Sequence, residues 1–149
     1  MKTPLSLLRL HRELEDISIA AGDTLALETF ADGSAHLTWH FHIKDGIYAG
    51  HKYRFLIKIK NDYPFSPPKP VCLDPVLHPS IDRLGRVCLN ITREDWSVRQ
   101  GIQAVIFGVS SIFYDIPCED PLNAAALELF LESPDKFQIA VQQTYQNGQ

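Results

Sequence analysis

The sequence lacks the cysteine pairs on which several classes of small protein depend. It has 149 residues and three cysteines, Cys72, Cys88 and Cys118, which are widely spaced and form no Cys-x-x-Cys motif. Zinc ribbons and thioredoxin-like redox sites both need such a motif, so both are disfavoured. An odd number of widely spaced thiols is typical of a protein from a reducing compartment. We therefore expect a cytoplasmic protein that is also small enough to enter the nucleus.

The sequence has no run of basic residues either. Its 14 Lys and Arg residues and its 18 Asp and Glu residues are interspersed, and the formal net charge is −4. A protein that binds nucleic acid or an anionic membrane needs a concentrated positive surface. Neither is therefore expected as the main partner of this chain.

No apolar stretch approaches the length of a membrane span. Residues 5–8 begin a leucine-rich run, but Arg9 and Arg12 interrupt it before it reaches the length of a signal peptide. The sequence shows no internal repeat, no low-complexity segment and no linker. With 45% hydrophobic residues, we expect residues 1–149 to form a single domain with a real core, and we expect a monomer.

The N-terminal residues have the pattern of an amphipathic helix. Thr3 is expected to cap it and Pro4 to occupy its first position. Apolar residues then recur at helical spacing as far as Ile17, with charged residues on the other faces. We therefore predict a surface helix of about four turns with one buried stripe.

Alternating apolar and polar residues predict the sheet. Residues 24–30, 35–43 and 53–59 have this pattern and are joined by short turns, which indicates an antiparallel meander. The proline-rich residues 63–68 end the third strand, and residues 71–73 are expected to add a short fourth one. Three histidines lie on one face of the second strand: His36, His40 and His42. Side chains two apart on a strand splay, so we expect a polar sheet face and no metal site.

The C-terminal third is predicted to be helical. Residues 102–114 contain no charged residue and have apolar side chains at helical spacing, which predicts a helix buried at the centre of the domain. Asp120-Pro121 and Ser133-Pro134 each have the form of a cap followed by proline, which predicts two further helix starts. The fold class is therefore α+β, with an N-terminal helix, a four-stranded antiparallel meander, a long loop and three C-terminal helices.

The long loop, residues 78–96, reads HPSIDRLGRVCLNITREDW. It has no regular hydrophobic period, but it contains enough apolar residues to be held in one conformation. Ordered loops of this length in a compact domain are usually functional. Cys88 lies near its middle and is the first candidate for chemistry. The alternative is a buried cysteine that packs as a small hydrophobic residue.

Three motifs in this chain resemble those of ubiquitin-conjugating enzymes. The active-site signature of that family is matched in residue type and spacing by His78, Pro79, Cys88, Leu89 and Trp96. Residues 63–68 resemble the family's proline-rich loop, and residues 120–123 resemble its gate loop. The resemblance extends over roughly residues 5–145 and implies the α+β fold of these enzymes.

Within the family, the chain is most similar to conjugating enzymes for the Nedd/Rub-type modifier. The similarity lies in residues 88–91, 93–96 and 119–123. Ubiquitin-dedicated relatives tend to have aspartate in place of Asn90, so an enzyme dedicated to ubiquitin remains the alternative. The long basic N-terminal extension that neddylation enzymes usually carry does not precede the first helix in this sequence.

The resemblance implies a transferase that works through a thiol. Cys88 would accept the C-terminal glycine of the modifier from an activating enzyme as a thioester and pass it to a lysine amine. Ser80 stands where the family has an asparagine that stabilises the oxyanion or its loop, and Asp120 would orient the incoming amine. Supporting roles would fall to His78, Pro79, Leu89, Asn90 and Trp96. Neither a cofactor nor a metal is implied.

The resemblance also implies docking surfaces for partner proteins. Phe65 and Val98 would form the apolar site on which a RING-type ligase docks. Arg9 and Arg12 would flank it and contribute to ligase or activating-enzyme docking. The alternative for both arginines is a solvated helix face.

Two other readings of the sequence remain open. A non-catalytic relative with the same fold would only bind a modifier or a partner, and the serine at position 80 is compatible with it. An unrelated cysteine hydrolase would need a histidine and an orienting Asn or Asp that converge on Cys88. For a conjugating enzyme we expect instead that His78 braces its turn by hydrogen bonds and forms no pair with Cys88.

Overall fold

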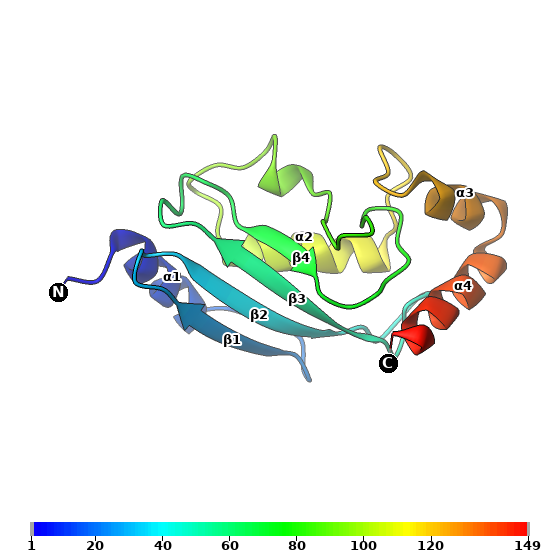
Figure 1. The fold of residues 1–149 in the computed structure, drawn as a ribbon, viewed down its shortest axis with the longest axis horizontal. Helices are drawn as coiled ribbons and strands as arrows, with labels where there is room; N and C mark the ends of the chain where they lie inside the picture. The colour runs from blue at the N-terminus through cyan, green and yellow to red at the C-terminus, as the bar shows by residue number, and fades with distance from the viewer. Residues whose placement is uncertain (1, 149) are drawn as a thin grey trace.

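The structure, a computed structural model, describes residues 2–148 and has the predicted α+β architecture (Figure 1). Its elements are α1 (Leu5–Glu15), β1 (Thr24–Thr29), β2 (Ala35–His42), β3 (Lys52–Ile59), β4 (Lys69–Cys72), the short 3₁₀ helix η1 (Asn90–Thr92), α2 (Ile102–Tyr114), α3 (Ala124–Glu132) and α4 (Pro134–Asn147). The four strands form one antiparallel sheet in the order β1-β2-β3-β4. α2 lies behind this sheet in Figure 1, and α3 and α4 lie at the end of the molecule away from α1. Within residues 2–148, no helix is both long and apolar enough to cross a bilayer.

The register of the sheet places apolar residues of neighbouring strands opposite one another. Leu37 pairs with Ile57 and Trp39 pairs with Phe55, and all four side chains are fully buried. Burying side chains of this size contributes roughly 1.5–3 kcal/mol each to stability. The alternation in the sequence therefore identified the face of the sheet that packs against α2.

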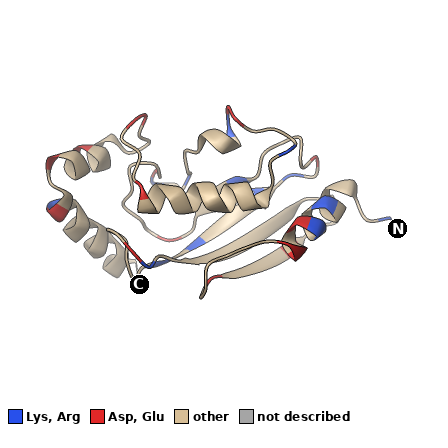
Figure 2. Cartoon of the chain, turned by 180° about the vertical axis from the view of Figure 1, so that it is seen from behind, with Lys and Arg blue, Asp and Glu red and all other residues tan. Residues whose placement is uncertain are grey.

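α2 covers this face, and it occupies the predicted residues. Its buried residues recur at helical spacing: Ile102, Val105, Ile106, Val109, Ile112 and Phe113. The ring of Phe113 packs edge-on against Phe55 of β3, with the ring centroids 6.0 Å apart. Figure 2 shows α2 from behind, with no charged residue along its length. One face of α2 is therefore buried against the sheet, while Phe107 and Tyr114 on the other face are exposed, so the prediction of a helix buried at the centre is only partly right.

The start of α2 is capped from another helix. The backbone N–H of Ile102 donates to Glu13 Oε1 at 3.0 Å, and the hydroxyl of Tyr63 donates to Glu13 Oε2 at 2.5 Å. A carboxylate at a helix N-terminus satisfies a free N–H group and interacts favourably with the helix dipole. Glu13 thus connects α1, α2 and the proline-rich loop. No local sequence pattern indicates this role.

Several predicted boundaries are wrong by a few residues. α1 begins at Leu5 with Pro4 at its N-cap, so Thr3 does not cap it, and it ends at Glu15 after three turns. β4 begins two residues earlier than predicted, at Lys69. The start of α4 after Ser133 is confirmed, because the Ser133 hydroxyl accepts a hydrogen bond from the N–H of Lys136.

The largest error concerns α3, which does not begin at Asp120-Pro121. It begins at Ala124, because the side chain of Asn123 accepts a hydrogen bond from the N–H of Ala126 at 3.1 Å. Asp120 lies in the preceding loop with φ of 47°, a left-handed conformation that cannot start a helix. Helix capping is therefore not the role of Asp120.

Candidate active site

The first half of the long loop folds into a tight turn that delivers Cys88. The carboxylate of Asp82 accepts hydrogen bonds from the N–H groups of Leu84 and Arg86, and it forms an ion pair with the Arg86 guanidinium at 2.7 Å. These contacts hold the pKa of Asp82 below its usual value. An isolated β-bridge then joins Ile81 to Val87, and the Cys88 N–H donates to the Ser80 carbonyl at 2.9 Å. The backbone on the N-terminal side of Cys88 is therefore fixed.

The second half of the loop forms η1, which packs against α2. The Thr92 hydroxyl donates to the Leu89 carbonyl at 3.1 Å, and Leu89 itself is buried. Leu89 and Ile91 lie so close to Gly108 of α2 that a Cβ there would be 3.4 Å from both side chains. Cys88 is thus held between an anchored turn and an anchored 3₁₀ helix, which confirms that the loop is ordered.

Cys88 itself is only half-buried. The interpretation of this residue as a buried packing cysteine is therefore wrong. Cys72 has that role instead, because it lies in the core and burial raises the pKa of its thiol to about 12. Cys118 is exposed, and all three thiols are free.

His78 is fully buried beneath this turn, and both of its ring nitrogens have partners. Nε2 donates to the carbonyl of Ile112 at 2.7 Å, and Nδ1 accepts from the N–H of Ser80 at 2.9 Å. Burial lowers the pKa of His78 to about 4, so the ring is neutral near pH 7. It stacks on Tyr48, with the centroids 5.4 Å apart. His78 therefore braces the turn and has no nitrogen left to act as a base for Cys88, which contradicts the cysteine-hydrolase interpretation.

The gate loop is bonded to the same turn. The N–H groups of Leu122 and Asn123 both donate to the carbonyl of Pro79, at 2.9 and 3.0 Å. These bonds place the exposed Asp120, two residues earlier, beside the segment that carries Ser80. Ser80 is buried and contacts Cys88 through its backbone carbonyl. The catalytic roles of Ser80 and Asp120 stay predictions.

Trp96 connects the end of the active-site loop to the proline-rich loop. Its Nε1 donates to the carbonyl of Pro64 at 2.9 Å, and its ring lies 6.3 Å from that of Tyr63. This contact anchors the loop. Phe65, which follows Pro64, and Val98, two residues after Trp96, are 75% and 44% exposed.

The two arginines of α1 differ in their surroundings. The guanidinium of Arg9 donates to the carbonyl of Gln100 at 2.6 Å and lies 3.5 Å from the Glu13 carboxylate. It therefore helps to hold α1 against the segment before α2. Arg12 is exposed. Docking by Arg9, Arg12, Phe65 and Val98 stays a prediction.

Arg93, noted from the sequence only as part of the similarity at residues 93–96, is a further residue of the site. Its Nη1 donates a hydrogen bond to the Sγ of Cys88 at 3.0 Å. In the sequence, Arg93 is a basic residue only five positions after Cys88, and so short a segment keeps it near the cysteine. Asn90 lies between them on η1 and is exposed.

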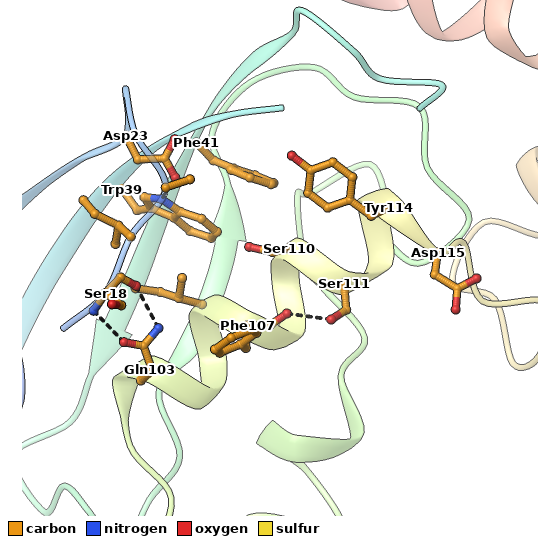
Figure 3. Close-up of a pocket in the computed structure, with 13 residues that line it drawn as sticks. Ser18, Asp23, Trp39, Phe41, Gln103, Phe107, Ser110, Ser111, Tyr114 and Asp115 are labelled. Carbon is orange, nitrogen blue, oxygen red and sulfur yellow. Dashed lines mark hydrogen bonds between the residues drawn. The ribbon is translucent and has the colours of Figure 1, made fainter. Parts of the chain in front are cut away.

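A separate apolar cavity of about 560 Å³ lies between α2 and residues 18–23 (Figure 3). Trp39, Phe41, Phe107 and Tyr114 point into it from β2 and α2. Gln103 on α2 closes one side by exchanging hydrogen bonds with the backbone of Ser18. Cys88, Ser80 and Asp120 do not line this cavity.

Comparisons with known proteins agree with this geometry. The family model described as "Ubiquitin-conjugating enzyme" matches residues 9–145. The chain is 34% identical over 142 residues to the NEDD8-conjugating enzyme UBC12 of Eremothecium gossypii, covering 95% of this chain and 76% of that protein. It is 36% identical over 146 residues to that of Saccharomyces cerevisiae, covering 95% and 78%. The solved structure of S. cerevisiae Ubc12 superposes with a TM-score of 0.92 at 33% identity, covering 99% of this chain and 80% of that one.

Proposed function

The chain belongs to the ubiquitin-conjugating enzyme family, and on that premise we propose that it carries a NEDD8-type modifier as a thioester on Cys88. The family makes it a transferase for ubiquitin-like proteins. The choice of modifier is supported by the similarity to enzymes named for NEDD8, and by Asn90 after the Cys88-Leu89 pair. The observation that carries the proposal is the partly exposed Cys88, held on both sides by anchored backbone.

The chemistry has two steps. In the first, the Cys88 thiolate attacks the thioester carbonyl on the activating enzyme, a C–S bond to Cys88 forms, and the thiolate of the activating enzyme leaves. In the second, a lysine amine attacks the new thioester, a C–N bond forms, and the Cys88 thiolate leaves. Neither step needs a histidine base at Cys88, which agrees with the use of both His78 nitrogens in the turn. Asp120, exposed in the gate loop, would orient the amine and take up its proton.

Members of this family work with a modifier, an activating enzyme and ligases. For this chain we propose that the ligase is of the RING type and that it docks on Phe65 and Val98, flanked by Arg9 or Arg12. Support comes from the exposure of these two apolar side chains next to the Trp96 anchor. We further propose that the enzyme acts as a monomer in the cytoplasm and the nucleus.

A charging assay tests the proposed function. The chain is incubated with ATP and either NEDD8 with its activating enzyme or ubiquitin with its own, and the products are resolved on gels with and without a thiol reductant. We expect a reductant-sensitive adduct with NEDD8 that disappears in Cys88→Ala. The exposed cysteine provides the matched control, so Cys118→Ala should charge as the unmodified chain does.

Three results would overturn the proposal. Faster charging with ubiquitin than with NEDD8 would establish the ubiquitin-dedicated alternative. The absence of an adduct with either modifier would establish a relative that binds without catalysis. An adduct that survives in Cys88→Ala would show that another residue carries the modifier.

Replacing Ser80 by asparagine should speed the second step. An amide donor reaches further toward a developing oxyanion than a hydroxyl does, and an oxyanion donor is worth on the order of 2.7–4 kcal/mol in other enzymes. Position 80 is buried, and the amide of the new asparagine need not reach the ideal geometry. We therefore expect the discharge rate to rise by about tenfold. Single-turnover discharge of the Cys88 thioester to free lysine measures it, while the rate of thioester formation should change little. Unchanged discharge would exclude an oxyanion role for position 80.

A further inference from the structure

We propose that Arg93 is a catalytic residue that stabilises negative charge on the Cys88 sulfur, an inference that rests on the proposed function and adds a residue to it. The direct observation is the hydrogen bond from Arg93 Nη1 to Cys88 Sγ at 3.0 Å. A guanidinium is always charged near neutral pH, and its hydrogen bonds to anions are stronger than neutral ones. The partner that gains most from such a donor is a thiolate.

The backbone of Arg93 is held in the position that this contact needs. Its N–H donates to the carbonyl of Asn90 at 3.0 Å, and the N–H of Asp95 donates to the same carbonyl at 2.9 Å. The carbonyl of Thr92 accepts from the Lys69 ammonium at 3.2 Å. The 3₁₀ turn therefore returns the chain toward Cys88, and only the side chain of Arg93 has to be ordered for the contact to form.

The charges around Arg93 leave it available to the sulfur. Its acidic neighbour, Glu94, lies 3.9 Å from Nη2, the other terminal nitrogen of the guanidinium. The side chain of Glu94 is 77% exposed, so this ion pair is screened by water and weak. Nη1, which contacts the sulfur, is not the atom engaged by Glu94.

The contact acts differently on the two states of the sulfur. In the thioester, Sγ is neutral and a poor acceptor. When the lysine amine attacks, the C–N bond forms, the C–S bond breaks, and the bonding pair moves to Sγ, while the amine loses a proton to a base or to water. Arg93 then faces a thiolate, so its hydrogen bond is stronger in the transition state and product than in the thioester. Interactions that strengthen in this way increase the rate.

The effect on charging should be smaller. There the Cys88 sulfur is the nucleophile, so a charged donor favours formation of the attacking thiolate but lowers its intrinsic reactivity. The two effects partly cancel. Arg93 is therefore expected to matter more for discharge than for charging.

The experiment compares Arg93→Gln, Arg93→Lys and a matched control, Arg83→Gln, which removes an exposed arginine from the turn before Cys88. The full chain is charged with NEDD8, and single-turnover discharge to free lysine is measured at pH 7. Arg93→Gln should slow discharge about fivefold, because the contact is a charged hydrogen bond at a partly exposed site. Charging should slow by about twofold or less. Arg93→Lys should recover part of the loss, and Arg83→Gln should match the unmodified chain.

A second measurement needs no modifier and separates this inference from the proposed function. In a Cys118→Ala background, alkylation of Cys88 by iodoacetamide at pH 7 should be about twofold slower in Arg93→Gln than in Arg83→Gln. The catalytic role is overturned if Arg93→Gln and Arg83→Gln discharge at the same rate, or if Arg93→Lys discharges no faster than Arg93→Gln. It is also overturned if discharge falls while alkylation is unchanged, because Arg93 would then act on a partner and not on the sulfur. If the chain charges with neither modifier, the proposed function is refuted. The alkylation rates then still show whether Arg93 acts on the Cys88 sulfur.

Discussion

Replacing Gly85 by alanine should lower the free energy of unfolding by about 3 kcal/mol. Gly85 has φ of +81°, where an L side chain is strained. A Cβ at this position would also lie 2.1 Å from the carbonyl oxygen of Cys72, and a backbone atom cannot rotate away. The backbone of Cys72 is held in place as well, because its N–H donates to the Gly85 carbonyl at 2.8 Å. The turn must therefore separate from β4 to admit the methyl group.

Gly50 provides a matched control for this prediction. Its φ is +85°, close to that of Gly85, but no atom lies within 4 Å of where its Cβ would be. Gly50→Ala should therefore cost only the conformational part, about 1 kcal/mol. Urea denaturation of both variants gives the comparison, and charging of Cys88 by the folded fraction reports on the turn. Equal losses of stability in the two variants would show that the approach of Gly85 to Cys72 is unimportant.

The sequence predicted the elements of the fold best where one pattern determined the structure. Residues 102–114 contain no charge and have apolar side chains at helical spacing, and α2 occupies those residues, although Phe107 and Tyr114 on its outer face are exposed rather than buried. Alternation likewise predicted β2 and its buried face. The start of α3 was missed because Asp120-Pro121 has the same composition as a true cap and proline. This segment differs from a true helix start in a tertiary contact: the N–H groups of Leu122 and Asn123 donate to the carbonyl of Pro79.

The candidate site was predicted in part for the same reason. Cys88 was identified by its motif, and the structure leaves it accessible. Glu13 was missed because its partner Ile102 is 89 residues away, and no local pattern relates them. Arg93 was missed because the path of its side chain depends on η1, a three-residue turn with no periodic signal. The close approach of Gly85 to Cys72 joins two segments that the sequence does not relate.

The stability of the chain should fall by about 3 kcal/mol as the pH is lowered from 7 to 4, mainly because of His78. In the folded protein burial holds the pKa of His78 at about 4, against an ordinary value of 6.5. Between these two values the unfolded chain binds a proton that the folded chain does not. Stability therefore rises with pH through this window, is fully present above about pH 6.5, and is lost as the pH falls toward 4.

Other groups contribute less within this window. His51 acts in the same direction, because burial lowers its pKa too, but it is less deeply buried than His78. The carboxyl groups of Asp32 and Asp82 have lowered pKa values, so the stability that they provide is lost mostly at pH values below the window. The slope between pH 6.5 and 4.5 is therefore assigned chiefly to His78.

A variant without the imidazole tests this assignment. His78→Gln can keep a donor toward the Ile112 carbonyl but has no group that titrates in this range, so it should be less stable at pH 7 and much less sensitive to acid. His40→Gln, at an exposed histidine of β2, should retain the slope of the unmodified chain. Urea denaturation at half-unit steps from pH 7 to 4.5 measures all three proteins. The folded chain keeps His78 neutral down to about pH 4, so its bonds to the Cys88 turn and to the last turn of α2 persist over this range, and charging should fall only where unfolding becomes appreciable. A His78→Gln variant that keeps the full slope would assign the acid sensitivity to other groups and remove His78 as the titrating brace of the active site.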